Sequence, residues 1–520
     1  MKKIFSVFIA IVLALLSLVP AYAVESNNSG QAPFVLVSGM GYEPLIMNAG
    51  TDSQQSVWPP EIIAEDLLPP IAKGLFSAAM GGGWLGLGDN LLPATYDILK
   101  YAACDNKGDS AYNVTTATYP QSLAHYPDLA SAQSSEGGLL HSACDKIGAD
   151  MTYYFNYDWR LSPMVNAAYL DAFIENVKLE KGCEKVDLAV LSMGGIVTLT
   201  YFQMFGSSSV KSCMLLCSTY SGVQLASDAM SLRLGIDKDD LLNYLPQNYG
   251  TTQAKAAMKA VFLLADIAGI GDDIVNFANA GLAALLDDFN KIIIQKVFLT
   301  MPGLWALVRA EDYEAAKTNL LDPQKQSGLI ERIDYVQYNV HQKRKEIIQN
   351  AMADGVRVTF VANYNLAPAP VYASSSFHSD TLIETARASG GAYCAALGTT
   401  LPARYVQQNA CSGHNHISPD NIIDASTADF PNQVWFVKNV RHVRCLYGSE
   451  YNELLLWLID QPTQITVFSS PDYPQFLGSD DDGMTLYRID TVEDPNTLLD
   501  YLLSLLKMIS AVNLPLFKTL

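Results

Sequence analysis

Six short apolar runs constrain the fold of this chain more than any other feature of its sequence. They are Phe34–Ser38, Thr152–Asn156, Val186–Leu191, Cys213–Cys217, Arg357–Ala362 and Gln433–Val437. Continuous apolar runs of this length are typical of strands that are buried on both faces of a parallel sheet. Helical patterns, such as Pro163–Leu179 and Gly194–Phe205, lie between them. The alternation predicts an α/β fold with a mostly parallel sheet and helices on both faces.

Two regions depart from this alternation. The interval from about 226 to 349 is almost entirely helical in pattern, and it is rich in alanine and leucine over Ala254–Ala268. We interpret it as a helical cap inserted over an edge of the sheet, with a helical subdomain that contacts no ligand as the alternative. Residues 461–520 are expected to form a C-terminal extension. Its Asp480–Gly483 segment lacks the ligand spacing of a calcium loop and is expected to be a solvated turn.

The N-terminus has the pattern of a secretory signal. Two lysines precede the apolar run Ile4–Val19, and the small-residue cleavage motif Ala21-Tyr22-Ala23 follows it. We expect cleavage after Ala23 and a secreted protein whose main domain spans 24–460; an uncleaved anchor is the alternative. The chain has 33 basic and 53 acidic residues, and cleavage removes two lysines, so the net charge changes from −20 to −22.

Composition and charge exclude several classes of protein. With 49% apolar and 17% charged residues, the chain is not intrinsically disordered. The acidic charge argues against nucleic acid as a partner, because a phosphate backbone selects basic surfaces. It also disfavours electrostatic capture by anionic membranes. Any peripheral contact with lipid is therefore expected to involve the apolar surface of the cap.

Eight cysteines in an exported chain permit disulfides. Each of the pairs Cys104–Cys144 and Cys394–Cys411 brackets a loop-like stretch, and we expect these two bonds. The cysteines at the ends of the apolar run Cys213–Cys217 are expected to be buried thiols. The sequence has no Cys-x-x-Cys motif, so we expect no structural zinc, and no cofactor is predicted.

The run Val186–Leu191 ends at Ser192, and two glycines follow as a helix begins. A serine on a sharp turn between a strand and a helix has an exposed hydroxyl, and the amide of the next residue, Met193, can stabilise an oxyanion. Ser192 is therefore the candidate nucleophile. Val190 stands where the usual Gly-x-Ser-x-Gly pattern has glycine. The alternative is a helix N-cap followed by close packing.

A second strand also ends in a turn that contains glycine, Ser38-Gly39-Met40-Gly41. In α/β hydrolases the turn after an early strand supplies the second oxyanion amide. Met40 is the expected donor here and Gly41 is the adjacent choice. The alternative is a tight turn that needs glycine for its backbone conformation.

A nucleophilic serine needs a histidine as base, and in this fold class the histidine follows the last strand. His442 follows Gln433–Val437 and is our candidate among seven histidines. His414 and His416 are the second choice; as a metal pair they lack an evident third ligand, so a surface loop is the plainer interpretation. His341 lies in a strongly charged helix and is expected to be solvated.

The carboxylate that orients the base is expected in the loop after Arg357–Ala362. Asp380 lies there and is our candidate for the acid. Asp420, Asp424 and Glu384 are the alternatives, because they lie between this strand and His442.

Several of these segments resemble the lecithin:cholesterol acyltransferase-like family of α/β hydrolases. The most specific is Tyr157-Asp158-Trp159-Arg160, which is similar to a Tyr-Asp-Trp-Arg segment of that family about thirty residues before the serine. Leu191–Gly195 resembles its His-Ser-Met-Gly-Gly, with leucine in place of histidine, and Ser38–Gly41 resembles its Pro-Gly-x-x-Gly turn, with serine in place of proline. Met301–Leu307 is similar to a segment that follows the family's cap helices.

The resemblance spans roughly residues 33–460 and implies an α/β-hydrolase fold with a cap. It places Asp380 and His442 at the positions of the family's acid and base. The implied function is that of a secreted serine esterase, lipase, phospholipase or O-acyltransferase that acts on acyl esters in lipid metabolism. Trp84, in a glycine-rich segment before the cap, and Trp159 are the candidate substrate-binding residues. Arg160 is expected to brace the fold by pairing with a carboxylate.

Two other functions remain open at this point. The altered serine turn and the long tail fit a non-catalytic exported binding protein on a hydrolase scaffold. An amidase or peptidase would use the same three residues on a different substrate.

Overall fold

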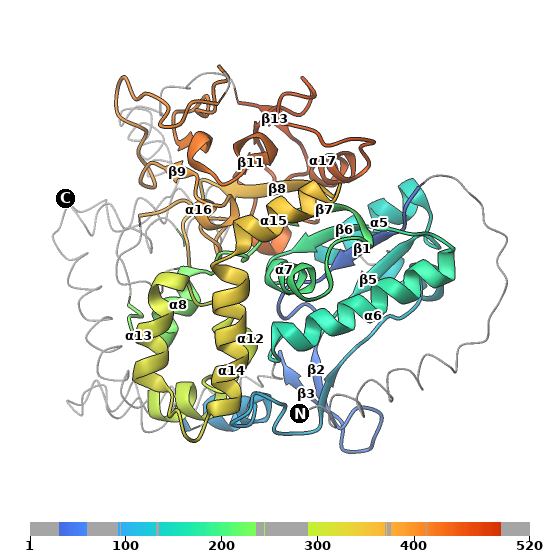
Figure 1. Ribbon diagram of the computed structural model, residues 1–520, viewed down its shortest axis with the longest axis vertical. Helices are drawn as coiled ribbons and strands as arrows, with labels where there is room; N and C mark the ends of the chain where they lie inside the picture. Colours follow the sequence, from blue (N-terminus) through green and yellow to red (C-terminus); the bar gives the residue numbers. More distant parts are fainter. Residues whose placement is uncertain are drawn as a thin grey trace, which may run out of the picture.

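Figure 1 shows a computed structural model of the protein. It describes residues 31–59, 92–93, 95–131, 135–235, 244, 290–369, 371, 376–411 and 413–489. The expected signal segment, Trp84 and the residues after Ile489 lie outside this part. None of the described helices combines the length and the apolar character needed to cross a bilayer.

An eight-stranded sheet forms the centre of the molecule (Figure 1). In spatial order its strands are β13 (Tyr487–Arg488), β12 (Phe476–Gly478), β11 (Val434–Lys438), β8 (Arg357–Tyr364), β7 (Val210–Leu216), β6 (Val186–Leu191), β1 (Phe34–Val37) and β5 (Thr152–Phe155). All neighbouring pairs are parallel except β12 and β13. Each of the six apolar runs forms a strand, and the predicted α/β fold with a mostly parallel sheet is confirmed.

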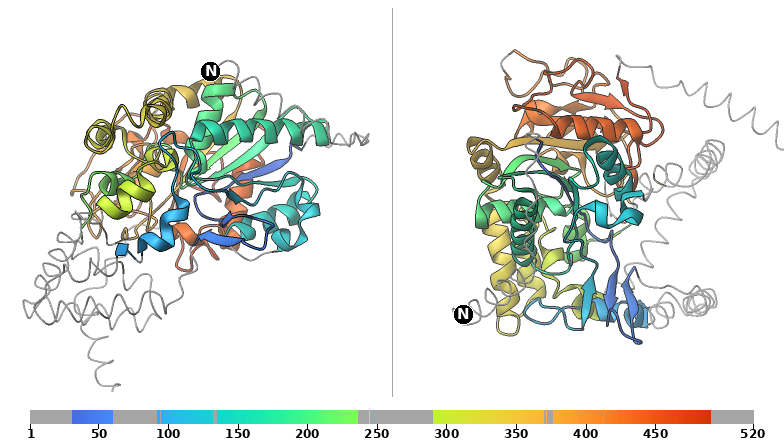
Figure 2. Two further views of the ribbon diagram at one scale, coloured as in Figure 1. Left: turned by 90° about the horizontal axis from the view of Figure 1, so that it is seen from below. Right: turned by 90° about the vertical axis from the view of Figure 1, so that its right-hand side faces the viewer.

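Helices cover both faces of this sheet (Figure 2). Side chains alternate along a strand, so Val35 and Val37 of β1 join one buried cluster while Phe34 and Leu36 join the other. The first face is covered by α6 (Pro163–Lys181), α7 (Gly194–Phe205) and α15 (Arg344–Ala353), and the second by α5 (Ser135–Ile147) and α17 (Ser449–Ile459). Strands buried on both faces explain why the runs are apolar throughout.

The remaining elements are short. Two small antiparallel sheets consist of β3 (Gln55–Trp58), β2 (Leu45–Met47) and β4 (Val114–Thr116), and of β10 (Ile423–Asp424) and β9 (Tyr393–Cys394). Short helices outside the cap are η2 (Lys100–Ala102), η3 (Leu123–His125), α4 (Pro127–Ser131), α16 (Thr385–Ala388), η6 (Ala425–Thr427), η7 (Pro431–Gln433) and η8 (His442–Arg444).

The described part of the interval predicted to be a cap is helical. It contains α8 (Gln224–Met230), η4 (Asn290–Phe298), α12 (Pro302–Trp305), α13 (Ala310–Leu320), α14 (Ser327–Val336) and η5 (Gln337–His341). All of these helices except η5 contribute to a small core of their own around Trp305 and Tyr313. The interval also includes α15, whose Ile347 and Ile348 belong to the core beneath the sheet. Its last helix is therefore part of the main body.

The expectation that His341 is solvated is wrong. Its side chain is buried, and its Nε2 lies 2.6 Å from the carbonyl oxygen of Ala306. Burial lowers the pKa of His341 to about 4. The charged residues Lys343 and Lys345 that follow it are exposed, whereas η5 packs against α7.

The expected boundary at residue 460 is also corrected, because the following segment completes the sheet. Strand β12 pairs in parallel with β11, and β13 pairs with β12. The turn between them leaves Asp480 and Asp481 exposed, as expected of a solvated turn, but it also contacts the body. Asp482 forms an ion pair with Arg441, and Asp481 accepts hydrogen bonds from Thr485. The residues after 460 are thus part of the same body up to the end of the described chain.

The two expected disulfides are absent, since all eight cysteines are free. Cys104 belongs to the cluster on one face of the sheet, and Cys144 packs against the cluster on the other. The sheet therefore separates these two side chains. Cys394 directs its thiol toward the carbonyl oxygen of Ala392 instead of toward Cys411.

Candidate active site

Ser192 lies on the turn between β6 and α7, where the sequence changes from apolar residues to glycine. Its φ of 52° is in the left-handed region. Such a conformation costs a non-glycine residue about 1–3 kcal/mol and persists only where the surroundings fix it. Here the Ser192 N–H donates to the Leu216 carbonyl at 3.0 Å, and its own carbonyl accepts from the N–H groups of Gly195 (3.0 Å) and Thr219 (3.1 Å).

Glycines allow the elements around Ser192 to approach closely. A β-carbon on Gly194 would lie 2.7 Å from the carbonyl oxygen of Ser38, and one on Gly195 would lie 1.6 Å from Ser218 Oγ. A β-carbon on Gly39 would lie 3.1 Å from the β-carbon of Ser192. The turn after β1 therefore packs directly against the serine turn.

The three candidate oxyanion donors lie on these two turns. Within the described residues, the backbone N–H groups of Met193, Met40 and Gly41 have no hydrogen-bond acceptor. Gly41 has a φ of 78°, which a residue with a side chain rarely adopts. The amides therefore remain available to a group bound beside Ser192.

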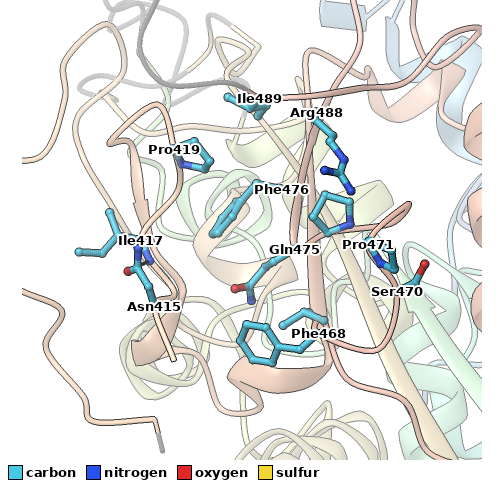
Figure 3. A pocket seen from close by; sticks show the side chains of 12 residues that line it. Asn415, Ile417, Pro419, Phe468, Ser470, Pro471, Gln475, Phe476, Arg488 and Ile489 are labelled. Carbon is cyan, nitrogen blue, oxygen red and sulfur yellow. Dashed lines mark hydrogen bonds between the residues drawn. The ribbon is translucent and has the colours of Figure 1, made fainter. Parts of the chain in front are cut away.

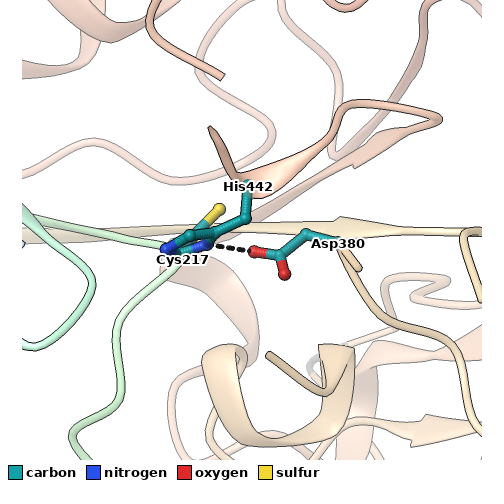
Figure 4. Close-up of side chains that lie close together, drawn as sticks. All are labelled: Cys217, Asp380 and His442. Carbon is teal, nitrogen blue, oxygen red and sulfur yellow. Dashed lines mark hydrogen bonds and ion pairs between the residues drawn. The ribbon is translucent and has the colours of Figure 1, made fainter. Parts of the chain in front are cut away.

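The structure brings the three candidate catalytic side chains together. The Ser192 Oγ lies 3.0 Å from His442 Nε2. Figure 4 shows the next contact, in which His442 Nδ1 lies 2.7 Å from Asp380 Oδ2. All three side chains are buried. The order along the chain of contacts is serine, imidazole and carboxylate, which is the arrangement that activates a serine.

Backbone groups hold the acid and the base in this position. Asp380 Oδ1 accepts hydrogen bonds from the N–H groups of Leu382 (3.1 Å) and Ile383 (2.8 Å). The His442 N–H donates to the carbonyl oxygen of Asp380 at 2.7 Å, so the two residues are joined through both backbone and side chain. This leaves Asp380 Oδ2 aimed at the imidazole.

The environment of His442 favours its charged form. Burial acts to lower the pKa of His442, but the nearby Asp380 carboxylate outweighs it and raises this pKa to about 10. A histidine that takes a proton from serine becomes an imidazolium. The buried carboxylate therefore stabilises the charge that such a step creates.

The other candidates for acid and base lie elsewhere. Asp420 pairs with Lys438, Asp424 caps a turn through the N–H of Ser426, and Glu384 accepts from the N–H of Gln224. His416 is buried with its Nδ1 2.8 Å from Gln475 Oε1, and His414 stacks on Phe468.

His414 and His416 lie beside a hollow of about 650 Å³, which is shown in Figure 3. Phe468, Phe476 and Arg488 are among the residues that line it. Ser192, Asp380 and His442 do not line this hollow. It is therefore separate from the candidate site.

A cavity of about 290 Å³ opens beside Ser192 and His442. Its walls are almost entirely apolar and come from the cap as well as the body; they include Leu225, Ala226, Ala229, Met230, Ile294, Phe298, Leu304 and Leu307. Met40 and Met193 also line it. The candidate site thus combines a polar series of hydrogen bonds with an apolar cavity.

The two candidate substrate-binding residues have different outcomes. Trp159 is buried in the cavity wall, where its ring meets the ring of Trp58 edge to face at 5.4 Å. Trp84 lies outside the described residues.

The segment around Trp159 is held by its neighbours. Arg160 is fully buried and forms a two-point ion pair with Asp158, at 3.0 and 2.6 Å, which confirms its bracing role. The Gly303 N–H donates to the Arg160 carbonyl, and a β-carbon on Gly303 would lie 1.8 Å from the Trp159 carbonyl oxygen. This close approach joins the segment to α12.

Sequence reasoning missed two interactions at or beside His442. Cys217 follows β7 with a φ of 43°, and its Sγ lies within 4.8 Å of ligand atoms of both His442 and Asp380 (Figure 4). Arg441 is paired with Asp482, 41 residues further along the chain. The only signal for Cys217 in the sequence is that it directly follows β7. This strand pairs with β6, which ends at Ser192.

Comparisons with known proteins add little. No protein-family model matches the chain, and no curated protein matches it. Among solved structures, the crystal structure of a Tle4–Tli4 complex has a TM-score of 0.27 at 12% sequence identity. The match covers 65% of this chain and 75% of the other. A similarity this low assigns neither fold family nor function.

Proposed function

We propose that the protein is a secreted serine hydrolase or O-acyltransferase that cleaves carboxylic esters of lipid acyl chains. In this proposal it is an α/β hydrolase of the lecithin:cholesterol acyltransferase-like family, with Ser192, Asp380 and His442 as catalytic residues. The observation that carries the proposal is the chain of hydrogen bonds from Ser192 through His442 to Asp380, at 3.0 and 2.7 Å, beside an apolar cavity.

In the first step, Ser192 Oγ attacks the ester carbonyl and its proton passes to His442 Nε2. The Nδ1–H of His442 donates to Asp380, which fixes the imidazole in the tautomer whose Nε2 can accept that proton. The tetrahedral intermediate then expels the alcohol, which takes the proton from His442, and an acyl-enzyme remains. Water or a second alcohol releases the acyl group by the same steps in reverse.

The oxyanion of the intermediate is placed at the amides of Met193 and Met40, with Gly41 as the adjacent donor. Their lack of other acceptors within the described chain supports this role. Donors already in position cost no reorganisation when the charge develops, and removing one typically costs about 10²–10³-fold in rate.

The cavity supports an acyl chain as the part of the substrate that is recognised. Each methylene moved from water into apolar surroundings contributes about 0.8 kcal/mol. Walls from α8, η4 and the segment after it meet Trp159 of the body around this space. The helical cap is therefore proposed to cover the acyl group, while the identity of the acceptor decides between hydrolase and transferase.

The test is turnover of p-nitrophenyl esters of increasing chain length by the wild type and by Ser192→Ala. Losing the nucleophile of a serine triad costs on the order of 10⁶ in kcat, so Ser192→Ala should be inactive. Ser218→Ala, which changes a buried serine outside the hydrogen-bonded chain, is the control and should remain active.

Labelling with a fluorophosphonate separates the competing functions. A non-catalytic binding protein would leave Ser192 unlabelled in the wild type. An amidase or peptidase would be labelled, but it would cleave p-nitroanilides and show no preference for longer acyl chains. Ester turnover that persists in Ser192→Ala would refute the proposal.

A further inference from the structure

We propose that Cys217, His442 and Asp380 form a binding site for a thiophilic divalent transition-metal ion such as Zn²⁺. The ligand atoms of these residues all lie within 4.8 Å of one another (Figure 4). A second consequence, which rests on the proposed function, is that an ion bound there inhibits the enzyme.

The three residues supply a ligand set that suits this class of ion. Zinc is commonly bound by thiolate, imidazole and carboxylate at about 2.0–2.3 Å, in tetrahedral geometry. Thiolate ligands favour soft or borderline ions over Mg²⁺ and Ca²⁺. Because the ligand atoms already lie within 4.8 Å of one another, only small side-chain movements are needed to bring them to these distances.

Three separate elements hold the ligands in place. Cys217 follows β7 in the left-handed region, and its N–H donates to the Val361 carbonyl at 2.8 Å. Asp380 is held by two backbone N–H groups through its Oδ1, which leaves Oδ2 for another partner. His442 lies on η8 and also lines the apolar cavity, whereas Cys217 and Asp380 do not line it.

The charges of the site fit a divalent cation. An isolated ion is costly to bury, but a buried charge is tolerated when opposite charges compensate it. Cys217, His442 and Asp380 are all buried. A thiolate from Cys217 and the carboxylate of Asp380 together balance the two positive charges of the ion.

Binding would disable the base by fixing the wrong tautomer. The ion bonds to Cys217 Sγ, whose proton leaves to water, and to His442 Nδ1, whose proton is replaced by one on Nε2. Asp380 Oδ2 exchanges its hydrogen bond for a bond to the ion. With a proton on Nε2, the imidazole can no longer accept the proton of Ser192, so attack on the ester stops.

Cobalt(II) is the probe for the site itself, because a bond between thiolate and Co²⁺ gives a charge-transfer absorption band that does not depend on activity. Titration of the full wild-type chain should produce this band at one ion per chain. The band should be absent in Cys217→Ala and Cys217→Ser, and retained in Cys213→Ala. Cys213 lies on β7, the strand that Cys217 follows, but it belongs to the cluster on the opposite face.

Inhibition is measured on the same proteins. Zn²⁺ should inhibit wild-type ester turnover reversibly, with activity restored by a chelator. Relative to each variant's own activity without metal, half-inhibition should require at least about tenfold more Zn²⁺ in the two Cys217 variants. Near-ultraviolet circular dichroism verifies that the variants are folded, and Cys217→Ser keeps nearly the size of the original side chain.

The outcomes distinguish the two proposals. A wild-type protein without the thiolate–cobalt band, or a Cys217→Ser variant that keeps it, overturns the metal site. Equal Zn²⁺ inhibition of the wild type and folded Cys217 variants overturns the inhibitory role. A cobalt band in a protein without ester turnover would support the site while refuting the proposed function.

Discussion

Ser192 and the pair formed by Asp380 and His442 meet in one hydrogen-bonded chain, yet the two sides of the site are held differently. The serine side is built by close backbone packing, with glycines where the turns after β1 and β6 approach each other. The acid–base side consists of loops after β8 and β11 that are tied together by polar contacts.

This difference predicts which substitutions disrupt each side of the site. An added methyl group should disturb the serine side, because a β-carbon on Gly39, Gly194 or Gly195 would lie within about 3 Å of a neighbouring atom in a closely packed region. The acid–base side should tolerate small changes in volume but not the loss of a charge or a donor, since its geometry depends on hydrogen bonds within a buried region.

Among the substitutions that compare the surroundings of the two sides, the largest effect is expected on the polar side, for Asp380→Asn. An asparagine keeps the shape but no longer enforces the Nδ1–H tautomer, and in a serine triad this change costs about 10⁴-fold in kcat. Asp420→Asn, at a rejected candidate for the acid, should have a far smaller effect. Comparable losses in both variants would contradict the assignment.

The pH dependence sharpens the same prediction. The Asp380 carboxylate raises the pKa of His442 against the opposing effect of burial. Activity needs the neutral imidazole, so wild-type activity should fall as the pH decreases through this raised pKa. The residual activity of Asp380→Asn should show its acid limb at lower pH.

The next largest effect is expected on the packed side, for Gly194→Ala. Its β-carbon would lie 2.7 Å from the Ser38 carbonyl oxygen, which forces the turn that carries Met40 away from Ser192. We expect about 10²-fold lower kcat from the displaced amide and a loss of about 1–3 kcal/mol in the free energy of unfolding. Ester kinetics and denaturant titration measure both quantities.

Gly328→Ala on α14 is the control for this substitution. A β-carbon there would come no closer than 3.4 Å to its neighbours, so activity should be unchanged. If both glycine variants behave like the wild type, close packing does not fix the serine side.

The smallest effect is expected for Asp482→Asn, which weakens a contact one residue away from the base. Arg441 donates to Asp482 from its backbone N–H at 3.2 Å and from its Nε at 3.0 Å. Both side chains are partly exposed, so the loss should be about 0.5–1 kcal/mol, equivalent to two- to fivefold in kcat. KM should not change, because neither residue lines the cavity.

Asp480→Asn is the matched control, because Asp480 contacts only the hydroxyl of Tyr487 among its described hydrogen bonds. A decrease in kcat in both variants would indicate a general effect of charge in the turn. A change in KM without a change in kcat would argue against the view that the Arg441–Asp482 contact positions His442.

The parts of the fold that could be predicted are those with a local signal. An apolar run of five or six residues identifies a buried strand on its own, and all six runs form strands. The turn at Ser192 is equally local, because strand, serine and glycines are adjacent in the sequence. Asp380 and His442 required the chain order of a fold class, and the structure places His442 within hydrogen-bonding distance of both Ser192 and Asp380.

The parts that could not be predicted depend on distant partners. Strands β12 and β13 have three and two residues, too few for any periodic pattern. His341 is buried because η5 packs against α7, although its sequence neighbours are charged. The expected bond between Cys104 and Cys144 failed because spacing along the chain does not indicate which face of a sheet a residue occupies.

The position of β12 has a practical consequence for anyone who shortens the chain. A protein that ends at residue 460 would lose the strand that pairs with β11, and the backbone N–H and carbonyl groups along that side of β11 would have no partners. Unpaired strand edges recruit other chains. Such a truncated protein should therefore self-associate, and it would also lack Asp482, the partner of Arg441 beside the base.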